Sequence, residues 1–406
     1  MGPRRPEPSA PLAGAGAPVD TGAVRSATTT AAAVTATLTA AAGLAAAATV
    51  AAVAVGRHAA DAALRNEPGR PLPGGPPLTV HSATADRVAL TLSIASLRPG
   101  TYALSAPGVH AVVGAVLPDA PHDPDTVVRR LVGVTHGTLA PGTRVRMTPQ
   151  IHVGNPRTAL GLDHADVDVP GELGALPAWF VPAARDTWVI TVHGLGGTRE
   201  HPMVVMPFLN HHRLPVLDLA YRGDLGAPLP PDGLGHLGAS EWRDLDAAIR
   251  YALRFGARRV VLHGWSTGAT MALLAAERSA LAGKISGLVL DSPVLDRRTT
   301  LERLAAARGT PAALLPLAVR AAEGRPGLQV DRQPPGADPA ALRMPVLIFH
   351  GPDDALAPWE PARRLAAARP DLVTLRTVAG APHGAMWNAD PAGYEEALRR
   401  FLTPLM

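Results

Sequence analysis

The chain has 406 residues, a length that suits one large α/β domain together with an extension. Its 38 Lys and Arg residues against 34 Asp and Glu residues give a formal net charge of only +4, and no basic run marks a nucleic-acid-binding groove. The absence of cysteine excludes a disulfide framework, a thiolate metal site and a cysteine nucleophile. We therefore expect no nucleic-acid partner, and chemistry that uses other side chains.

The N-terminal 77 residues have the composition of an extension. Residues 1–25 are rich in Pro, Gly and Ala, which predicts disorder. Residues 26–56 contain no charged side chain and, as a helix, would span about 46 Å against about 30 Å for a bilayer core. We expect a transmembrane or signal-anchor helix there, with the side of the membrane open; a cleaved signal peptide and a soluble low-complexity segment are the alternatives. The Pro- and Gly-rich residues that follow predict a linker over 57–77.

The next segment has a β-type pattern. Short β-like runs cover residues 78–84, 87–94, 101–106, 110–118, 126–137 and 144–153. Pro-Gly turns such as Arg98-Pro99-Gly100 separate some of them, and this spacing predicts a small antiparallel β module over 78–155. Its scattered histidines follow no ligand spacing, and no catalytic constellation is visible in this module.

From residue 156 onward, buried-type strands alternate with helical stretches. The expected strands are 188–193, 215–221, 258–264, 286–293, 344–351 and 372–378, and the expected helices between them are 240–255 and 268–282. This alternation predicts an α/β domain over 156–406, with a mostly parallel sheet covered by helices on both faces. Ligands of such sheets bind at the carboxyl ends of the strands, so the candidate chemistry is sought there.

A G-x-S-x-G motif occupies residues 264–268. It follows a β-branched strand and precedes a helical stretch, so a sharp strand-to-helix turn would expose the hydroxyl of Ser266 near a helix N-terminus. We interpret Ser266 as a nucleophile; a glycine-flanked N-cap serine is the alternative.

A serine nucleophile needs a base, and the base needs an orienting acid. Asp354 follows the strand 344–351, and His383 lies on the loop after the last strand. The order Ser266, Asp354, His383 therefore predicts a catalytic triad. Asp353 and, more distantly, Asp291 are rivals for the acid.

The segment His193-Gly194-Leu195-Gly196-Gly197 follows the first strand of the predicted sheet. Its glycines allow backbone amides to face a cleft, and we expect the amides of Leu195 and Thr267 to form an oxyanion hole. A plain Gly-rich turn is the alternative. His193 is expected to hold this loop in place.

Taken together, four motifs resemble those of the α/β-hydrolase superfamily. They are HGLGG (193–197), GWSTG (264–268), HGPDDALAP (350–358) and GAPHG (380–384). The resemblance covers about residues 165–406 and implies the α/β-hydrolase fold, and its HG-x-x-D pattern selects Asp354. The departure is Pro382 before His383, where glycine is more usual. With its apolar N-terminal segment and β module, the chain looks like the membrane-anchored serine hydrolases of actinobacteria.

The resemblance also implies a cap insertion over 294–343. The residues of this insertion predict helices at 299–307 and 311–322. We expect the apolar residues of this insertion either to line an acyl pocket or, equally, to pack onto the sheet. They are Leu304, Leu314, Leu315, Leu317 and Val319. On the loop after the second strand, Arg222 either binds a substrate carboxylate or forms an ion pair with Asp224 or Glu241.

No cofactor and no metal are expected. His201, His211 and His212 lack the helical HExxH pattern and an acidic partner at ligand spacing, and no phosphate-binding glycine motif follows a strand. The sequence predicts a serine hydrolase of small-molecule carboxylic esters that acts through an acyl-enzyme. A serine peptidase or amidase of the same fold, and a non-catalytic membrane-tethered binding protein, are the alternatives. The oligomeric state stays open.

Overall fold

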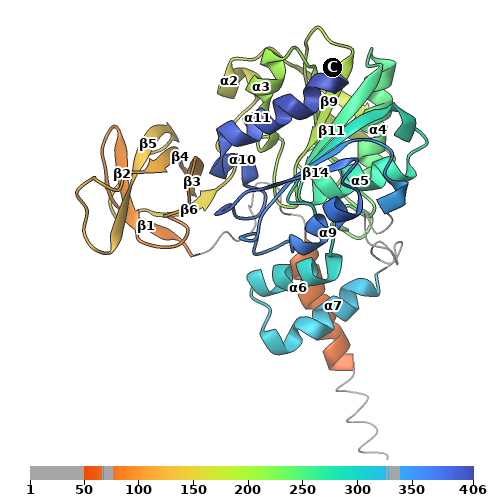
Figure 1. Cartoon of the computed structure of the whole chain (residues 1–406). Helices are drawn as coiled ribbons and strands as arrows, with labels where there is room; N and C mark the ends of the chain where they lie inside the picture. Colours follow the sequence, from red (N-terminus) through yellow and green to blue (C-terminus); the bar gives the residue numbers. More distant parts are fainter. Residues whose placement is uncertain (1–49, 66, 68–75, 326–327, 329–338) are drawn as a thin grey trace, which may run out of the picture. The chain divides into compact units, whose positions relative to one another are not determined.

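The computed structural model describes residues 50–65, 67, 76–325, 328 and 339–406. The chain divides into two compact units, residues 1–54 and 55–406. All the strands lie in the second unit, which contains a six-stranded barrel and an eight-stranded sheet with its helices (Figure 1).

The predicted β module is a closed antiparallel barrel with strand order β1-β2-β5-β4-β3-β6. Its strands are β1 (Leu78–Ala83), β2 (Arg87–Thr91), β3 (Tyr102–Ala106), β4 (Val109–Val116), β5 (Thr126–His136) and β6 (Arg144–Thr148). Pairing of β1 with β6 closes the barrel. Alternation of side chains across the strands places Val88 and Leu90 of β2 in the barrel core and leaves Arg87 exposed.

The second sheet is mostly parallel, as expected, and has the order β14-β13-β12-β11-β9-β10-β8-β7. Its strands are β7 (Ala165–Pro170), β8 (Ala175–Val181), β9 (Thr187–Val192), β10 (Val216–Leu219), β11 (Arg259–Trp265), β12 (Ile285–Asp291), β13 (Val346–His350) and β14 (Val373–Thr377). β8 is antiparallel to both β10 and β7, and the remaining pairs are parallel. The sequence analysis missed β7 and β8. β7 reads ADVDVP and lacks the apolar run of a buried strand, and Pro177 interrupts the apolar run of β8, ALPAWFV.

Helices cover both faces of this sheet. On one face lie α4 (Trp242–Arg254), α5 (Thr267–Arg278) and α9 (Glu360–Ala368), and on the other lie α2 (Pro156–Leu160), α3 (Met206–His211), α10 (Met386–Ala389) and α11 (Pro391–Leu402). Two further helices, α6 (Arg297–Ala307) and α7 (Leu315–Glu323), pack together in a separate cluster. Short 3-10 helices cover Pro202–Val205, Ala282–Lys284, Ala312–Leu314, Pro339–Ala341 and Thr403–Leu405.

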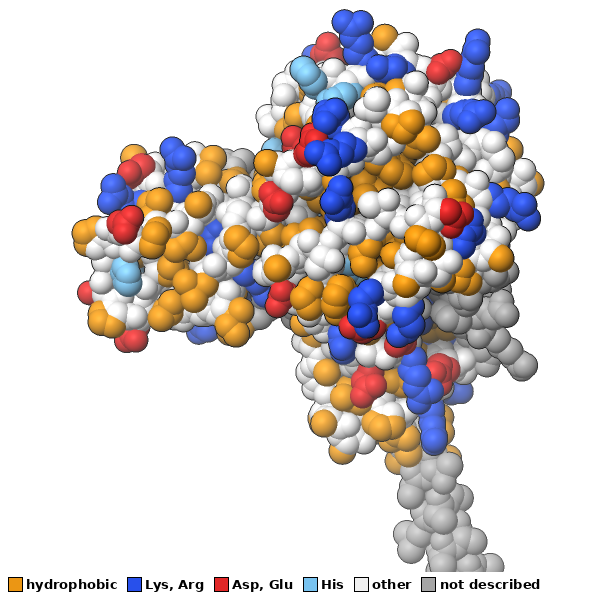
Figure 2. All heavy atoms as spheres, viewed as in Figure 1, with side chains coloured by type: hydrophobic (Ala, Val, Ile, Leu, Met, Phe, Trp, Pro, Cys, Tyr) orange, Lys and Arg blue, Asp and Glu red, His pale blue; other side chains and the backbone are white. Residues whose placement is uncertain are grey.

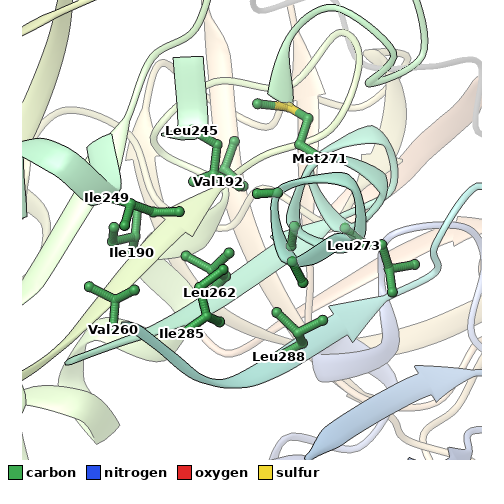
Figure 3. Close-up of a cluster of buried hydrophobic side chains, with 14 of the residues drawn as sticks. Ile190, Val192, Leu245, Ile249, Val260, Leu262, Met271, Leu273, Ile285 and Leu288 are labelled. Atoms are coloured by element: carbon green, nitrogen blue, oxygen red, sulfur yellow. The ribbon is translucent and has the colours of Figure 1, made fainter. Parts of the chain in front are cut away.

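Alternate strand residues supply the two cores on either side of the sheet. Val260 and Leu262 of β11 pack in the core with α4 and α5, where Figure 3 shows them beside Ile249 and Leu273. Val261, the residue between them, lies in the other core, to which α3 and α11 contribute. Burial on both faces of the sheet explains why these strands are continuous apolar runs. The packing on both faces also fixes the positions of the strand ends, which the site residues follow.

The N-terminal region differs from the expectation. Residues 50–64 are helical, so the expected linker over 57–77 begins with helix. Ala60, Ala63 and Leu64 recur on one face of this helix and pack with α6 and α7, and this packing adds to the high helix propensity of its alanines. Residues 26–49 of the expected membrane segment lie outside the described residues. Within the described part of the chain, no helix has both the length and the apolar character that crossing a membrane requires.

The surface of the described residues mixes both signs of charge. On the face drawn in Figure 2, Lys and Arg side chains are interspersed with Asp and Glu side chains. This agrees with the small net charge of the chain.

Candidate active site

Ser266 occupies the sharp turn between β11 and α5. Its backbone has φ 54° and ψ −117°, a conformation that is rare for a residue with a side chain. The flanking glycines make the turn sterically possible: a Cβ on Gly264 would lie 2.3 Å from Gly268, and a Cβ on Gly268 would lie 2.3 Å from the carbonyl oxygen of Val192. The spacing G-x-S-x-G thus follows from close packing on both sides of the turn.

The structure brings Ser266, His383 and Asp354 together. The Nε2 atom of His383 lies 2.6 Å from Ser266 Oγ, and its Nδ1 atom lies 2.8 Å from Asp354 Oδ2. A carboxylate only accepts hydrogen bonds, so Nδ1 of a neutral His383 carries the proton. Its Nε2 atom is then free to accept the proton of the serine hydroxyl.

Asp354 is held as a charged carboxylate inside the protein. Its Oδ1 atom accepts hydrogen bonds from the amides of Leu356 (2.9 Å) and Ala357 (2.8 Å), and Oδ2 accepts from His383 and from His350 (3.1 Å). Burial alone would raise the pKa of Asp354, but the attraction of His383 and the hydrogen bonds from both histidines hold it well below its usual value.

The two rival acids have other contacts. Asp353 is exposed and accepts a hydrogen bond from the amide of Gly380 at 2.7 Å. Asp291 is fully buried at the end of β12, where burial raises its pKa to about 7. Neither carboxylate has a hydrogen bond to His383 within the part of the chain that the structure describes.

A second network, which the sequence analysis missed, supports the loop of the histidine. Ser292 Oγ donates a hydrogen bond to Asp291 and accepts one from the amide of Gly384, next to His383, both at 2.9 Å. The only signal in the sequence is the pair Asp291-Ser292 at a strand end, which has no recognised spacing relative to His383. The network ties the loop of His383 to β12.

The loop after β9 is the segment expected to direct a backbone amide toward the cavity. Leu195 and Thr267 both border the Ser266 turn or its cavity, and within the described residues neither backbone amide donates a hydrogen bond to a protein acceptor. His193, fully buried, lies 2.9 Å from Asp224 Oδ2 through Nε2 and 2.9 Å from the carbonyl oxygen of Gly194 through Nδ1. Burial disfavours its charged form, but the carboxylate of Asp224 raises the pKa of His193 overall. His193 therefore holds the loop.

A cavity of about 300 Å³ opens at Ser266. Its walls come from the barrel, the loops at the strand ends and α6. They are formed by Arg98, Tyr102, Met147, Thr148, Pro149, Gln150, Gly194, Leu195, Gly196, Gly197, His201, Trp265, Ser266, Arg303, Leu304, Ala307, Ala355, Leu356, Pro382, His383 and Gly384. Most of these side chains are apolar, and the cavity is large enough for a small ester.

Two expectations for the walls need correction. Of the five apolar residues of the insertion, only Leu304 lines the cavity. Val319 is buried against the N-terminal helix, because that helix covers α6 and α7. Arg222 is buried and forms an ion pair, but with Asp244 (2.6 Å) and Glu172 (3.0 Å) and not with the partners expected from the sequence.

The histidines considered as metal ligands lie in different places. His201 lines the cavity, where burial lowers its pKa to about 3, whereas His211 and His212 stand at the end of α3. No group of three or more potential metal-ligating side chains occurs among the residues that the structure describes.

Comparisons with known proteins agree with this division of the chain. A family model described as a domain of unknown function (DUF8805) matches residues 79–148, the barrel. The crystal structure of an esterase from Pyrococcus furiosus is similar over 62% of this chain and 95% of that chain, with 22% identity and a TM-score of 0.52. Another crystal form of this esterase covers 62% and 97%, with 20% identity and a TM-score of 0.51. No curated protein matches the chain.

These similarities show the fold of the larger part of the chain. It is the α/β-hydrolase fold, with the mostly parallel sheet and the helices on both faces described above. The expected fold class is thereby confirmed, including the β-rich module that precedes the hydrolase part.

Proposed function

We propose that the protein is a serine hydrolase that cleaves carboxylic esters through an acyl-enzyme. The observation that carries the proposal is the continuous hydrogen-bonded chain from Ser266 Oγ through His383 to Asp354, with distances of 2.6 and 2.8 Å. The strained turn at Ser266 and the cavity that opens on it add support. The fold similarity to an esterase is consistent with it.

In the first half of the reaction, Ser266 Oγ attacks the acyl carbon while its proton moves to Nε2 of His383. The bond between the acyl carbon and the alcohol oxygen then breaks, and His383 returns the proton to that oxygen. Asp354 keeps the imidazole in the required tautomer and stabilises its charged form. The amides of Leu195 and Thr267 donate hydrogen bonds to the oxyanion.

In the second half, water attacks the acyl-enzyme with His383 as base. The proton that His383 takes from water returns to Ser266 Oγ as the acyl bond breaks, which releases the carboxylic acid. The proton transfer between Ser266 Oγ and Nε2 of His383 uses atoms already within hydrogen-bond distance, and the reaction needs no cofactor.

Hydrolysis of p-nitrophenyl esters of graded acyl length by the full chain tests the proposal. We expect turnover by the wild type, and loss of about four to six orders of magnitude in kcat for Ser266→Ala. Ser286→Ala is the matched control, since Ser286 lies on the same sheet and its hydroxyl bonds only to the Val260 carbonyl. Faster cleavage of aminoacyl amides than of every ester, or equal activity of Ser266→Ala and wild type, would contradict it.

A further inference from the structure

The barrel forms part of the wall of the Ser266 cavity. The barrel and the segment directly after it contribute Arg98, Tyr102, Met147, Thr148, Pro149 and Gln150. The barrel and the hydrolase part belong to the same compact unit, so this wall is part of one folded body. The cavity is therefore incomplete without a module for which the matched family description gives no function.

The arginines that line the cavity have no acidic counterpart among the lining residues. They are Arg98 of the barrel and Arg303 of α6. Within the described residues, neither guanidinium forms a hydrogen bond or an ion pair. Asp353 is near enough to attract Arg98 without forming an ion pair, and burial lowers the pKa of Arg98. The cavity thus holds two partly buried positive charges that protein groups leave without a bound partner.

Tyr102 supplies a hydrogen-bond donor in the same wall. Its side chain is only 1% exposed, and its hydroxyl is buried with no hydrogen-bond partner among the described residues. Burial raises the pKa of Tyr102 to about 12, so the hydroxyl keeps its proton at neutral pH. A buried hydroxyl without a partner is unfavourable, and an acceptor oxygen on a ligand would satisfy it.

Hydrogen bonds on the barrel side fix the segment that carries these two side chains. The buried guanidinium of Arg129 donates to four backbone carbonyls, those of Ser96 (2.9 Å), Arg98 (2.6 Å), Gly100 (2.8 Å) and Gly114 (2.6 Å from Nη2). A buried charged group that donates its hydrogen bonds to several backbone carbonyls of a loop makes that loop rigid.

On the hydrolase side, Asn388 holds the same segment. Its side chain donates to the carbonyls of Thr101 and Pro149, both at 2.9 Å, and its own carbonyl accepts from the amide of Thr101 at 2.8 Å. Gly100 has φ 87°, and a Cβ there would lie 1.9 Å from the carbonyl oxygen of Asn388, so only glycine fits this close approach. Arg98 and Tyr102 thus stand on a preorganised support, as a binding site requires.

We propose that the barrel is the substrate-recognition module of the proposed hydrolase, and that Arg98, Tyr102 and Arg303 bind an anionic group carried by the ester substrate. The proposal rests on the proposed function. Two cations and a neutral hydroxyl donor match the oxygens of a carboxylate or a phosphate, and the apolar remainder of the wall accommodates the hydrocarbon part of the ester.

Matched ester pairs test the proposal with the full chain. Mono-p-nitrophenyl adipate is compared with p-nitrophenyl 6-methylheptanoate, which has the same shape without the charge. The second pair places the charge on the alcohol: the hexanoate ester of 4-hydroxybenzoate is compared with that of 4-hydroxybenzamide. We expect the wild type to prefer the anionic member of at least one pair by about tenfold or more in kcat/KM, since a charge-assisted hydrogen bond is worth that factor.

Substitutions test which residues cause the preference for the anionic ester. Arg98→Met and Tyr102→Phe should each reduce it severalfold, whereas Arg144→Met, which changes an exposed arginine of the same barrel, should retain it. Hydrolysis of the neutral esters with no anionic preference in either pair, or a preference that both variants retain, overturns this inference and leaves the proposed function intact. Absence of hydrolysis of all four esters overturns both.

Discussion

The barrel and the hydrolase sheet use buried charge in different ways. In the hydrolase part, two buried charged groups meet side chains of opposite charge or potential charge: Asp354 meets His383, and Arg222 meets Asp244. In the barrel, every hydrogen bond that the buried guanidinium of Arg129 makes within the described residues goes to a backbone carbonyl. The pair of Asp354 and His383 can move a proton, whereas the hydrogen bonds of Arg129 shape a loop. This difference is consistent with the roles proposed above, catalysis by the hydrolase part and recognition mainly by the barrel.

After the loss expected for Ser266→Ala, the largest effect concerns the acid of the triad. Asp354→Asn keeps the shape but places an amide where His383 Nδ1 donates, which favours the wrong tautomer. We expect kcat for an ester to fall by about 10⁴, as for other Ser-His-Asp enzymes. Asp353→Asn is the matched control, because Asp353 is exposed and, within the described residues, its hydrogen bond is to the amide of Gly380 and not to His383. A larger loss for Asp353→Asn than for Asp354→Asn would reassign the acid.

The next effect is on the stability of the barrel. Arg129→Met leaves four carbonyls without their donor, and we expect the free energy of unfolding to fall by about 3 kcal/mol or more. Every tryptophan lies outside residues 78–148, so tryptophan fluorescence reports on the hydrolase part, whereas far-ultraviolet circular dichroism reports on both.

In Arg129→Met, the circular dichroism transition in denaturant should therefore begin before the fluorescence transition. The exposed neighbour provides the control: Arg130→Met should change stability by less than about 0.5 kcal/mol. Coincident transitions at the wild-type midpoint in Arg129→Met would show that the buried guanidinium does not support the barrel.

A third effect is confined to the hydrolase sheet. Asp218 of β10 is fully buried, with one hydrogen bond from Thr191 at 2.7 Å, and burial raises its pKa to about 7 from 3.8. Between about pH 4 and pH 7 the folded protein holds a proton that the unfolded chain has released, so this group lowers stability as pH rises through that window.

Asp218→Asn removes this titration. From pH 5 to pH 8 the wild type should lose roughly 1–3 kcal/mol more stability than the variant, measured by denaturant unfolding at each pH. Parallel stability curves for the two proteins would contradict a raised pKa at this position.

The smallest effect lies at the contact between the two parts. Asn388→Ala removes the two hydrogen bonds to the carbonyls of Thr101 and Pro149, and we expect a loss of about 1–2 kcal/mol in unfolding free energy. The anionic-ester preference should fall together with stability, because the support of Arg98 and Tyr102 is loosened. Retention of the full preference would show that Arg129 alone is sufficient to hold the segment.

The sequence was most informative where function follows from local geometry. The strands of the parallel sheet are apolar runs buried on both faces, and the three side chains proposed as catalytic each follow one of the sheet's strands. β7 could not be recognised in this way, since this edge strand alternates polar and apolar residues and lacks a continuous apolar run.

The part of the cavity wall that carries Arg98 and Tyr102 could not be predicted from the sequence, for a different reason. The segment that carries Arg98 and Tyr102 is held by hydrogen bonds between Thr101 and Asn388, which are 287 residues apart in the chain. The partners of Arg222 were missed similarly: Glu172 and Asp244 flank it at distances of 50 and 22 residues, with no motif to relate them. Such contacts depend on how segments that are distant in the sequence pack together in the barrel and the sheet. The local sequence pattern does not predict this packing.

The central claim is that Ser266 is the residue that becomes acylated. Incubation of the full chain with a fluorophosphonate, followed by proteolysis and mass spectrometry, tests it directly. The account predicts one adduct, on the peptide that contains Ser266, and slower labelling in His383→Ala because the base is lost. Ester hydrolysis by a wild-type protein that carries the adduct on another serine, or carries none, would contradict the account.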